Sequence, residues 1–239
     1  MAGPATPVVP QIVSASYRTD IPCFHAVWFA ARLKAGFCQV QNPYGGGSRR
    51  VGRRALVWRY DPIVLGTLTP PAWHVRTFKD LACALEGAVD EVVVSFVQSY
   101  RKTVRNMNAA GRAHGFGWRE AQPDERASLA ATLQGIAATH AIRLSVCGAD
   151  DALNHHDQAR CIDARRLSDI AGRAIPAGAR SHRKGCEGAQ SVDIGAYDTC
   201  TQGCAYCYAV SSRARAKARL ARLDPAAPAL WPTTPGDAG

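Results

Sequence analysis

The sequence predicts a mixed α/β fold in which largely parallel strands alternate with helices. Residues 91–97 are nearly all apolar and β-branched, which is typical of a strand buried on both faces of a parallel sheet. Segments with helical spacing of apolar residues separate such strands, in the order β, α, β, β, α, β, α, β. Alternation of this kind favours a parallel sheet, either open or closed into a barrel.

The N-terminal part of the chain predicts the first βαβ unit. Residues 12–16 read as a short buried strand, and residues 37–41 as a second one. The helix between them starts near Pro22, ends at Gly36 and has an apolar face with i, i+3, i+4, i+7 spacing, made of Phe24, Val27, Trp28 and Ala31. Residues 44–54 then predict a flexible basic loop.

The middle of the chain continues the alternation. A third strand is expected over residues 55–60, ending at Asp61-Pro62. Thr69-Pro70 resembles a helix N-cap followed by proline, and that helix has a stripe of Phe78, Leu81, Ala82 and Leu85. After the strand at 91–97, a helix with Pro123 near its start carries Leu129, Leu133, Ile136 and Ala137 on one face, and residues 142–147 form the next strand.

The C-terminal part is less regular. We expect a short helix over residues 164–171, a polar loop over residues 173–190 and a last, cationic helix over about 206–223. The predicted organisation is a disordered start at residues 1–10, one domain at residues 11–223 and a disordered tail at residues 224–239.

Composition limits the function classes. The chain begins without the basic and apolar segments of a secretory signal, and its apolar runs are far shorter than the about 20 residues that span a bilayer, so we expect a soluble, cytoplasmic protein without membrane contact. Nine cysteines in that compartment favour metal binding over disulfides. The net charge of +10 favours nucleic acid as a partner, although an arginine-rich, alanine-rich composition alone also produces it.

The most informative motif is a C-x3-C-x2-C arrangement made by Cys200, Cys204 and Cys207. Three thiolates this close together can bind one metal centre. A 4Fe-4S cluster has four irons, so three thiolates leave one iron open to an external ligand. An open iron can bind and activate a small molecule.

With Tyr206 before its third cysteine, this motif resembles the signature of radical S-adenosylmethionine enzymes. The resemblance implies that Cys200, Cys204 and Cys207 bind a 4Fe-4S cluster and that S-adenosylmethionine binds the open iron. It further implies an electron donor for the cluster, a 5′-deoxyadenosyl radical that attacks an unknown substrate, and a place for Tyr206 in the cofactor pocket.

A second resemblance covers nearly the whole predicted domain. Residues 12–22, 58–63, 95–103 and 191–209 are similar, in matching order, to the bacterial domain of unknown function family number 1848. The C-terminal cysteines of that family are likened to the radical S-adenosylmethionine motif. The cysteine motif of that superfamily usually follows the first barrel strand, so its place near residue 200 implies a circularly permuted (β/α) barrel, with residues 191–194 as the strand before the cluster loop.

The chain departs from the family pattern in two places, which affect the expected barrel and the expected cysteine ligands. Family members have further strand segments after the position of Asn42-Pro43, where this chain has only the basic loop, which predicts a partial barrel that is open there. The family also tends to have a Cys-x-Cys pair where this chain has Cys186-Glu187-Gly188.

Other readings of these residues remain open. The three motif cysteines also suit a structural zinc site, closed by Cys186 or His182, or a set of thiols that bind no metal. Two hypotheses apply to Cys147, Cys161 and Cys186: they form an auxiliary metal site, or they are simply packed in the core. Arg59 and Asp61, at a strand end, suit either cofactor binding or an internal ion pair. The alternative function is a noncatalytic iron-sulfur or zinc protein that binds nucleic acid.

Overall fold

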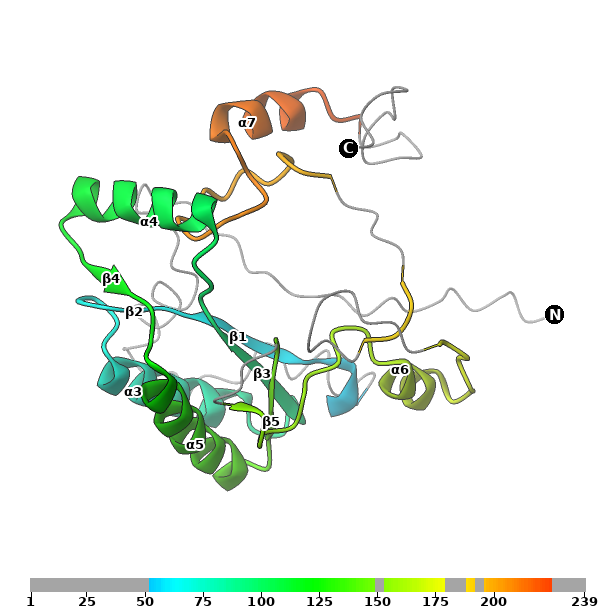
Figure 1. Ribbon diagram of the computed structural model, residues 1–239. Helices are drawn as coiled ribbons and strands as arrows, with labels where there is room; N and C mark the ends of the chain where they lie inside the picture. Colours follow the sequence, from blue (N-terminus) through cyan, green and yellow to red (C-terminus); the bar gives the residue numbers. More distant parts are fainter. Residues whose placement is uncertain (1–51, 149–152, 179–187, 192–195, 225–239) are drawn as a thin grey trace.

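The computed structural model describes residues 52–148, 153–178, 188–191 and 196–224. Its elements, shown in Figure 1, are a 3-10 turn η2 (Arg53–Ala55), strands β1 (Trp58–Ile63), β2 (Leu65–Gly66), β3 (Glu91–Phe96), β4 (Trp118–Arg119) and β5 (Arg143–Val146), and helices α3 (Pro71–Leu85), α4 (Arg101–His114), α5 (Pro123–Thr139), α6 (Ala164–Ala171) and α7 (Arg213–Ala221). The first two strands, the first helix and the disordered start expected from the sequence lie outside the described residues, as does the tail after residue 224.

The mixed α/β class is confirmed by a parallel three-stranded sheet in the order β1-β3-β5. Tyr60 pairs with Val94 across the first strand pair, and Val94 pairs with Val146 across the second. Strands β2 and β4 form a separate antiparallel pair. In the part of the chain that the structure describes, the parallel strands form an open sheet and not a closed barrel.

The core lies where α3 and α5 pack together against the sheet (Figure 1). Strand β3 is at its centre, with Val92 and Val94 fully buried, as its β-branched sequence predicts. The helices bury the residues expected from their spacing, namely Phe78, Leu81 and Ala82 on α3 and Leu129, Leu133 and Ala137 on α5, while Leu85 and Ile136 are partly buried at the edge.

A buried ion pair attaches α6 to the edge of this core. Arg166 donates to Glu91 at 2.5 Å and to Asp90 at 2.7 Å, and both Arg166 and Glu91 are almost inaccessible to solvent. Glu91 also accepts from Ser145 at 2.6 Å and pairs with Arg143 at 2.9 Å. The carboxylate at the start of β3 is therefore satisfied from three sides.

Two element boundaries differ from the sequence prediction. The strand expected over residues 55–60 spans Trp58–Ile63, so Arg59 and Asp61 lie inside it and not at its end. It begins late because η2 precedes it and Arg53 there donates to the carbonyls of Val89 and Ala141. Helix α3 begins at Pro71, one residue later than expected, because the Thr69 hydroxyl donates to the Val64 carbonyl and does not cap the helix.

The last helix was also predicted too long. It begins at Arg213 and not near residue 206, because Ser212 caps it by accepting from the backbone N–H of Arg215. Residues 206–212 lie in turns and bends, not in a helix. Of the strand expected at residues 191–194, Ser191 is not in a strand and the remainder lies outside the described residues.

Helix α4 was not predicted at all. Its buried stripe is narrow and weakly apolar, made of Thr103, Met107 and Gly111. Gly111 is required there, because a Cβ atom would lie 2.6 Å from the carbonyl oxygen of Phe116. Within the described ranges, none of the helices is both long and apolar enough to cross a bilayer.

Candidate functional site

The segment that carries the three motif cysteines is held against the N-terminal half of α4. Three α4 side chains bind its backbone carbonyls: Thr103 donates to Tyr206 at 3.2 Å, Lys102 to Tyr208 at 2.9 Å, and Asn106 to Cys207 at 3.5 Å. We call residues 196–212 the cysteine loop. Its third cysteine is thus placed by a helix about 100 residues earlier in the chain.

Asp198 closes the cysteine loop at its other end. Its backbone N–H donates to the carbonyl of Ala209 at 3.0 Å, and its side chain accepts from the backbone N–H groups of Ser211 and Ser212. Arg215 of α7 pairs with the same carboxylate at 3.3 Å. These bonds, the one from Ser211 first, lower the pKa of Asp198, so the buried carboxylate is ionised near neutral pH.

The three cysteines differ in exposure along the loop. Cys200 is exposed, whereas Cys204 and Cys207 are partly buried, and the N–H of Cys207 donates to the carbonyl of Cys204 at 3.1 Å. Gly203, with a φ of 73°, precedes this turn. A Cβ at Gly203 would lie 3.2–3.3 Å from the guanidinium end of Arg213, so that cation lies across the backbone beside Cys204.

The donor set of the cysteine loop suits a soft metal centre. It provides three thiols, and its one carboxylate, Asp198, is already bound by backbone N–H groups and Arg215. Thiolates are the usual ligands of iron-sulfur clusters and of structural zinc. In the described segments, no three Cys, His, Asp or Glu side chains are gathered closely enough to hold a metal ion.

The two tyrosines of the loop face different surroundings. The Tyr206 ring is partly buried and packs against a small apolar cluster that contains Val64, Met107 and Phe116. Tyr208 is 57% exposed, and its ring lies 6.1 Å from that of Tyr100 at the start of α4. Tyr206, expected in a cofactor pocket, therefore also has a packing role.

A second group of predicted site residues meets beside the carboxyl end of β5. The sulfurs of Cys147, which follows β5, and Cys161 lie 3.6 Å apart. Beside them on β1, Arg59 pairs with Asp61 at 2.5 Å. Cys186, the third member expected for an auxiliary site, lies outside the described residues.

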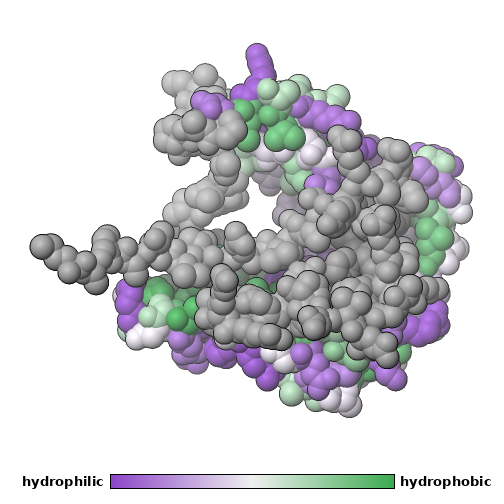
Figure 2. Space-filling view, turned by 180° about the vertical axis from the view of Figure 1, so that it is seen from behind, coloured by the Kyte–Doolittle hydropathy of each residue, from purple (hydrophilic) through white to green (hydrophobic). Residues whose placement is uncertain are grey.

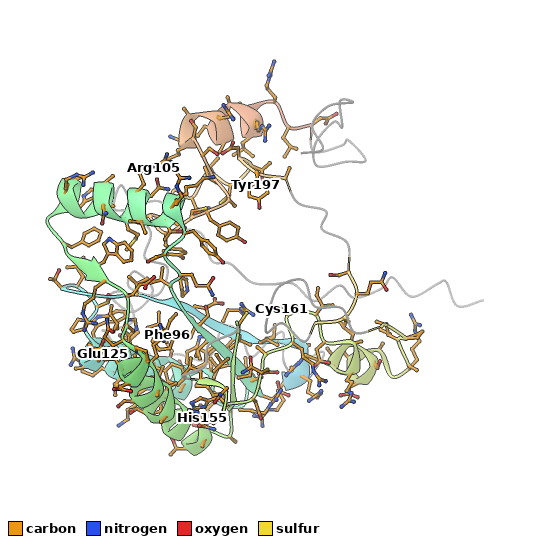
Figure 3. All side chains as sticks on the ribbon, viewed as in Figure 1. Phe96, Arg105, Glu125, His155, Cys161 and Tyr197 are labelled. Carbon is orange, nitrogen blue, oxygen red and sulfur yellow. The ribbon has the colours of Figure 1, made fainter. Side chains whose placement is uncertain are left out.

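The side chains of this second group shift one another's pKa values. The hydrogen bond with Cys147 and burial raise the pKa of Cys161, against the opposing effect of Arg59. Burial acts to lower the pKa of Arg59, but Asp61 and the two cysteines raise it, so the guanidinium stays charged. Figure 3 places Cys161 by the sheet and Tyr197 on the cysteine loop below α7, so the two cysteine groups are separate places.

Three residues that hold the loop were not singled out by sequence reasoning. Lys102, Thr103 and Asn106 belong to the unpredicted helix α4, and nothing local marks them as loop anchors. The available signal was that residues 100–103 are one of the segments similar to the bacterial family. Their position beside the cysteine loop became visible only in the structure.

The fold and site define an α/β protein in which a parallel sheet and a following helix position a loop of three thiols. A family model matches residues 12–48 and 47–209, including all three motif cysteines. The chain belongs to this family, Domain of unknown function (DUF1848), as its motifs predict. No curated protein and no solved structure matches the chain in the corresponding comparisons.

Proposed function

We propose that this chain is an iron-sulfur protein whose 4Fe-4S cluster is bound by Cys200, Cys204 and Cys207, and that it is a radical S-adenosylmethionine enzyme. The observation that carries the proposal is the anchoring of the C-x3-C-x2-C segment. It is a loop held from one side by Lys102 and Thr103 and closed by Asp198. Such anchoring fixes the backbone that carries the three thiols.

The residues of the loop have distinct roles in this proposal. The three thiols would hold three of the four irons of the cluster, which would supply the one electron, received from an external donor, that breaks the C5′–S bond of S-adenosylmethionine to give methionine and a 5′-deoxyadenosyl radical. Partial burial of Cys204 and Cys207 limits access of water and oxygen. The nearby Arg213 cation offsets the negative charge of three thiolates.

The finer fold assignment is part of the same proposal. A partial, circularly permuted (β/α) barrel accounts for a parallel sheet in the order β1-β3-β5 together with a cysteine loop near the C-terminus. In that arrangement Arg59 and Asp61, the second and fourth residues of β1, lie beside Cys147 at the carboxyl end of β5 and would contact a cofactor bound at that end of the sheet, where α/β folds bind their ligands.

An auxiliary metal site at Cys147 and Cys161 is supported by one distance. Two thiolates on one tetrahedral metal lie about 3.8 Å apart, given metal–sulfur bonds of about 2.3 Å. The observed separation of 3.6 Å is close to that value. Core packing of the two thiols predicts the same proximity, so metal content in variants must decide between them.

The first experiment counts metal. After anaerobic reconstitution with iron and sulfide, the parent should contain about four iron and four sulfide per cysteine-loop cluster, with visible absorption. Cys204→Ala should lose it, and Cys83→Ala on α3 is the matched control that should keep it. An auxiliary site would add further metal to the parent. Cys161→Ala should lose this additional metal, whereas Cys204→Ala should keep it. Zinc without iron, or iron unchanged in Cys204→Ala, contradicts the proposal.

The second experiment tests the enzyme class. The cluster is reduced with dithionite and mixed with S-adenosylmethionine, and release of 5′-deoxyadenosine is measured by chromatography. The proposal expects release together with a changed electron paramagnetic resonance spectrum. An intact cluster with neither response would identify the noncatalytic alternative.

A further inference from the structure

The positive charge of the chain is concentrated around the cysteine loop. Residues 100–117 and 196–224 contain nine of its 29 Lys and Arg but only two of its 19 Asp and Glu. One of the two acids, Asp198, is buried and bound to Ser211, Ser212 and Arg215. These two segments therefore account for most of the net charge of +10.

The cationic side chains are presented to solvent. Arg101, Arg105 and Arg112 are exposed on α4, as are Arg213, Arg215 and Lys217 on α7 and Arg222 directly after it. Figure 3 shows α4 with Arg105 and the loop with Tyr197 at the same end of the molecule, and Figure 2 shows hydrophilic side chains projecting there over α7. We call α4, α7 and the cysteine loop the basic face.

Exposed tyrosines occur on this face. Seven large apolar or aromatic side chains are exposed among the described residues, and the three aromatic ones are Tyr100, Tyr197 and Tyr208, with exposures of 49%, 61% and 57%. All three flank or belong to the cysteine loop. Aromatic rings open to solvent beside arginines are stacking surfaces for nucleobases.

The backbone beneath these rings is fixed by cationic side chains. Lys102 donates to the carbonyl of Tyr208 at 2.9 Å, and Arg219 donates to the carbonyl of Tyr197. The Tyr100 and Tyr208 rings lie 6.1 Å apart and are inclined by 51°, so each keeps an open side. Because the backbone that carries Tyr197 and Tyr208 is already fixed, less conformational freedom is lost when a base stacks on their rings.

We propose that the basic face binds single-stranded nucleic acid, with phosphates on the arginines of α4 and α7 and bases on Tyr100, Tyr197 and Tyr208. Unpaired bases can be splayed onto aromatic rings, whereas the bases of a duplex are stacked on one another and not available. Stacking on aromatic rings does not distinguish one base from another, so such contacts select single strands over duplexes more than they select sequence. The inference goes beyond the proposed function, since it requires neither cluster nor S-adenosylmethionine.

The experiment measures fluorescence anisotropy of the full-length chain with labelled 20-nucleotide oligomers of deoxythymidine and of uridine and with a duplex of equal length. Both the metal-free and the reconstituted protein are titrated, each at several salt concentrations. We expect single strands to bind more tightly than the duplex in both forms. Comparison of the two oligomers tells whether the 2′-hydroxyl contributes.

Variants separate the two kinds of contact. Tyr208→Ala should weaken single-strand binding about fivefold or more with an unchanged salt dependence, and Tyr208→Phe should not. The pair Arg213→Glu and Lys217→Glu should weaken binding and lower the slope of log affinity against log salt by about 0.7 per lost phosphate contact. The matched control reverses two exposed cations on α3, Arg76→Glu and Lys79→Glu, and should bind as the parent does.

Two results would overturn the proposal. One is that the α3 control and the α7 pair weaken single-strand binding equally, which would mean that the oligomer is attracted to the whole cationic surface and not to the basic face. The other is parent-like affinity of Tyr208→Ala, Tyr197→Ala and Tyr100→Ala combined, which means that the rings do not stack on bases. Because the metal-free protein is used, either result would leave the cluster proposal unaffected, and loss of the cluster would leave this one unaffected.

Discussion

The hydroxyl of Thr103 on α4 donates to the carbonyl of Tyr206 at 3.2 Å, and the two residues lie 103 positions apart in the chain. Thr103 is 2% exposed, so its hydroxyl has little access to water. This contact joins α4, the helix that follows β3, to the residue directly before the third motif cysteine. Its loss should loosen the loop and leave the rest of the fold intact.

Thr103→Val tests this connection, because valine keeps the shape of threonine and removes its hydroxyl. Loss of the bond should cost about 1 kcal/mol of local stability, which corresponds to an about fivefold faster opening of the loop. The measurement is the alkylation rate of Cys207 by iodoacetamide in metal-free protein. Thr132→Val on α5, whose hydroxyl bonds only within its helix, is the control. Equal rates in parent and Thr103→Val would show that the bond does not hold the loop.

The buried pair of Arg166 and Glu91 predicts a large loss of stability when one partner is removed. Arg166→Met should lower the free energy of unfolding by about 3–5 kcal/mol, because Glu91 stays buried without its closest cation. Adding Glu91→Gln should recover part of that loss. The free energies of unfolding are measured with urea. The control is Arg143→Met, which removes a half-exposed partner of Glu91 and should lower the free energy of unfolding much less. Equal effects of the two arginine substitutions would contradict this account.

His74 predicts how stability changes with pH. Its Nε2–H donates to the Val64 carbonyl at 3.0 Å, so Nδ1 accepts from the Tyr60 hydroxyl at 2.9 Å, and the neutral ring has both nitrogens bonded. Burial, which outweighs the bond to Val64, lowers the pKa of His74 below its ordinary value of 6.5. The unfolded chain therefore binds this proton at a higher pH than the folded chain does.

The expected consequence is a loss of stability as the pH falls below about 7, through the ordinary histidine pKa and on toward the lower folded value. His156, whose pKa is lowered by burial and by His155, should contribute in the same direction. His74→Phe should therefore be less stable at pH 7.5 but lose less on transfer to pH 5, as measured by thermal melting. A pH dependence identical to that of the parent in both His74→Phe and His156→Phe would show that the lowered pKa values of these histidines do not cause the loss of stability.

The contact between Cys147 and Cys161 predicts slow thiol chemistry at an exposed position. The pKa of Cys161 is raised chiefly by its hydrogen bond with Cys147, so little of it is thiolate at pH 8. Cys147→Ala removes that bond and leaves the effect of Arg59, which lowers the pKa. Alkylation of Cys161 at pH 8, followed by mass spectrometry, should become faster, and Cys83→Ala should not change it. A slower or unchanged rate in Cys147→Ala would refute the assigned cause.

Elements with strong local signals could be predicted from the sequence. The β-branched run of β3, the Pro123 start of α5 and the short α6 were found within about a residue of their bounds. Asp163 begins α6 by accepting from two backbone N–H groups of its first turn, a purely local device. Such elements are determined by neighbours in sequence, which pattern analysis can read.

Features set by distant residues were missed. Residues 206–212 have no helix breaker, and they leave the helical conformation because Asp198 and three α4 side chains bind their backbone. Helix α4 itself was missed because its buried positions include a threonine and a glycine. The cysteine spacing was readable without a fold, but the anchors of that loop depend on a contact across half the chain.

Tyr206 has a packing role in the structure and a proposed role in binding the cofactor, and three variants separate the two. Its ring packs against the cluster that contains Val64, Met107 and Phe116, so truncation should cost about 2 kcal/mol of stability for a partly buried aromatic ring. The resemblance to radical S-adenosylmethionine enzymes adds a contact with the adenine of the cofactor, worth on the order of 1 kcal/mol. Tyr206→Phe keeps both contacts and should match the parent.

Tyr206→Ala should lower the melting temperature, keep the parent iron content and bind S-adenosylmethionine about fivefold more weakly, because the side chain contributes no thiolate. The measurement is titration of the reduced cluster, followed by electron paramagnetic resonance. Tyr208→Ala, two residues further on and exposed, is the matched control and should change neither melting nor affinity. If Tyr206→Ala melts earlier but binds the cofactor as the parent does, the ring is a packing residue alone. If Tyr206→Ala also loses iron, the packing of Ala205 and Tyr206 against Val64, Met107 and Phe116 is what holds the cysteines in place.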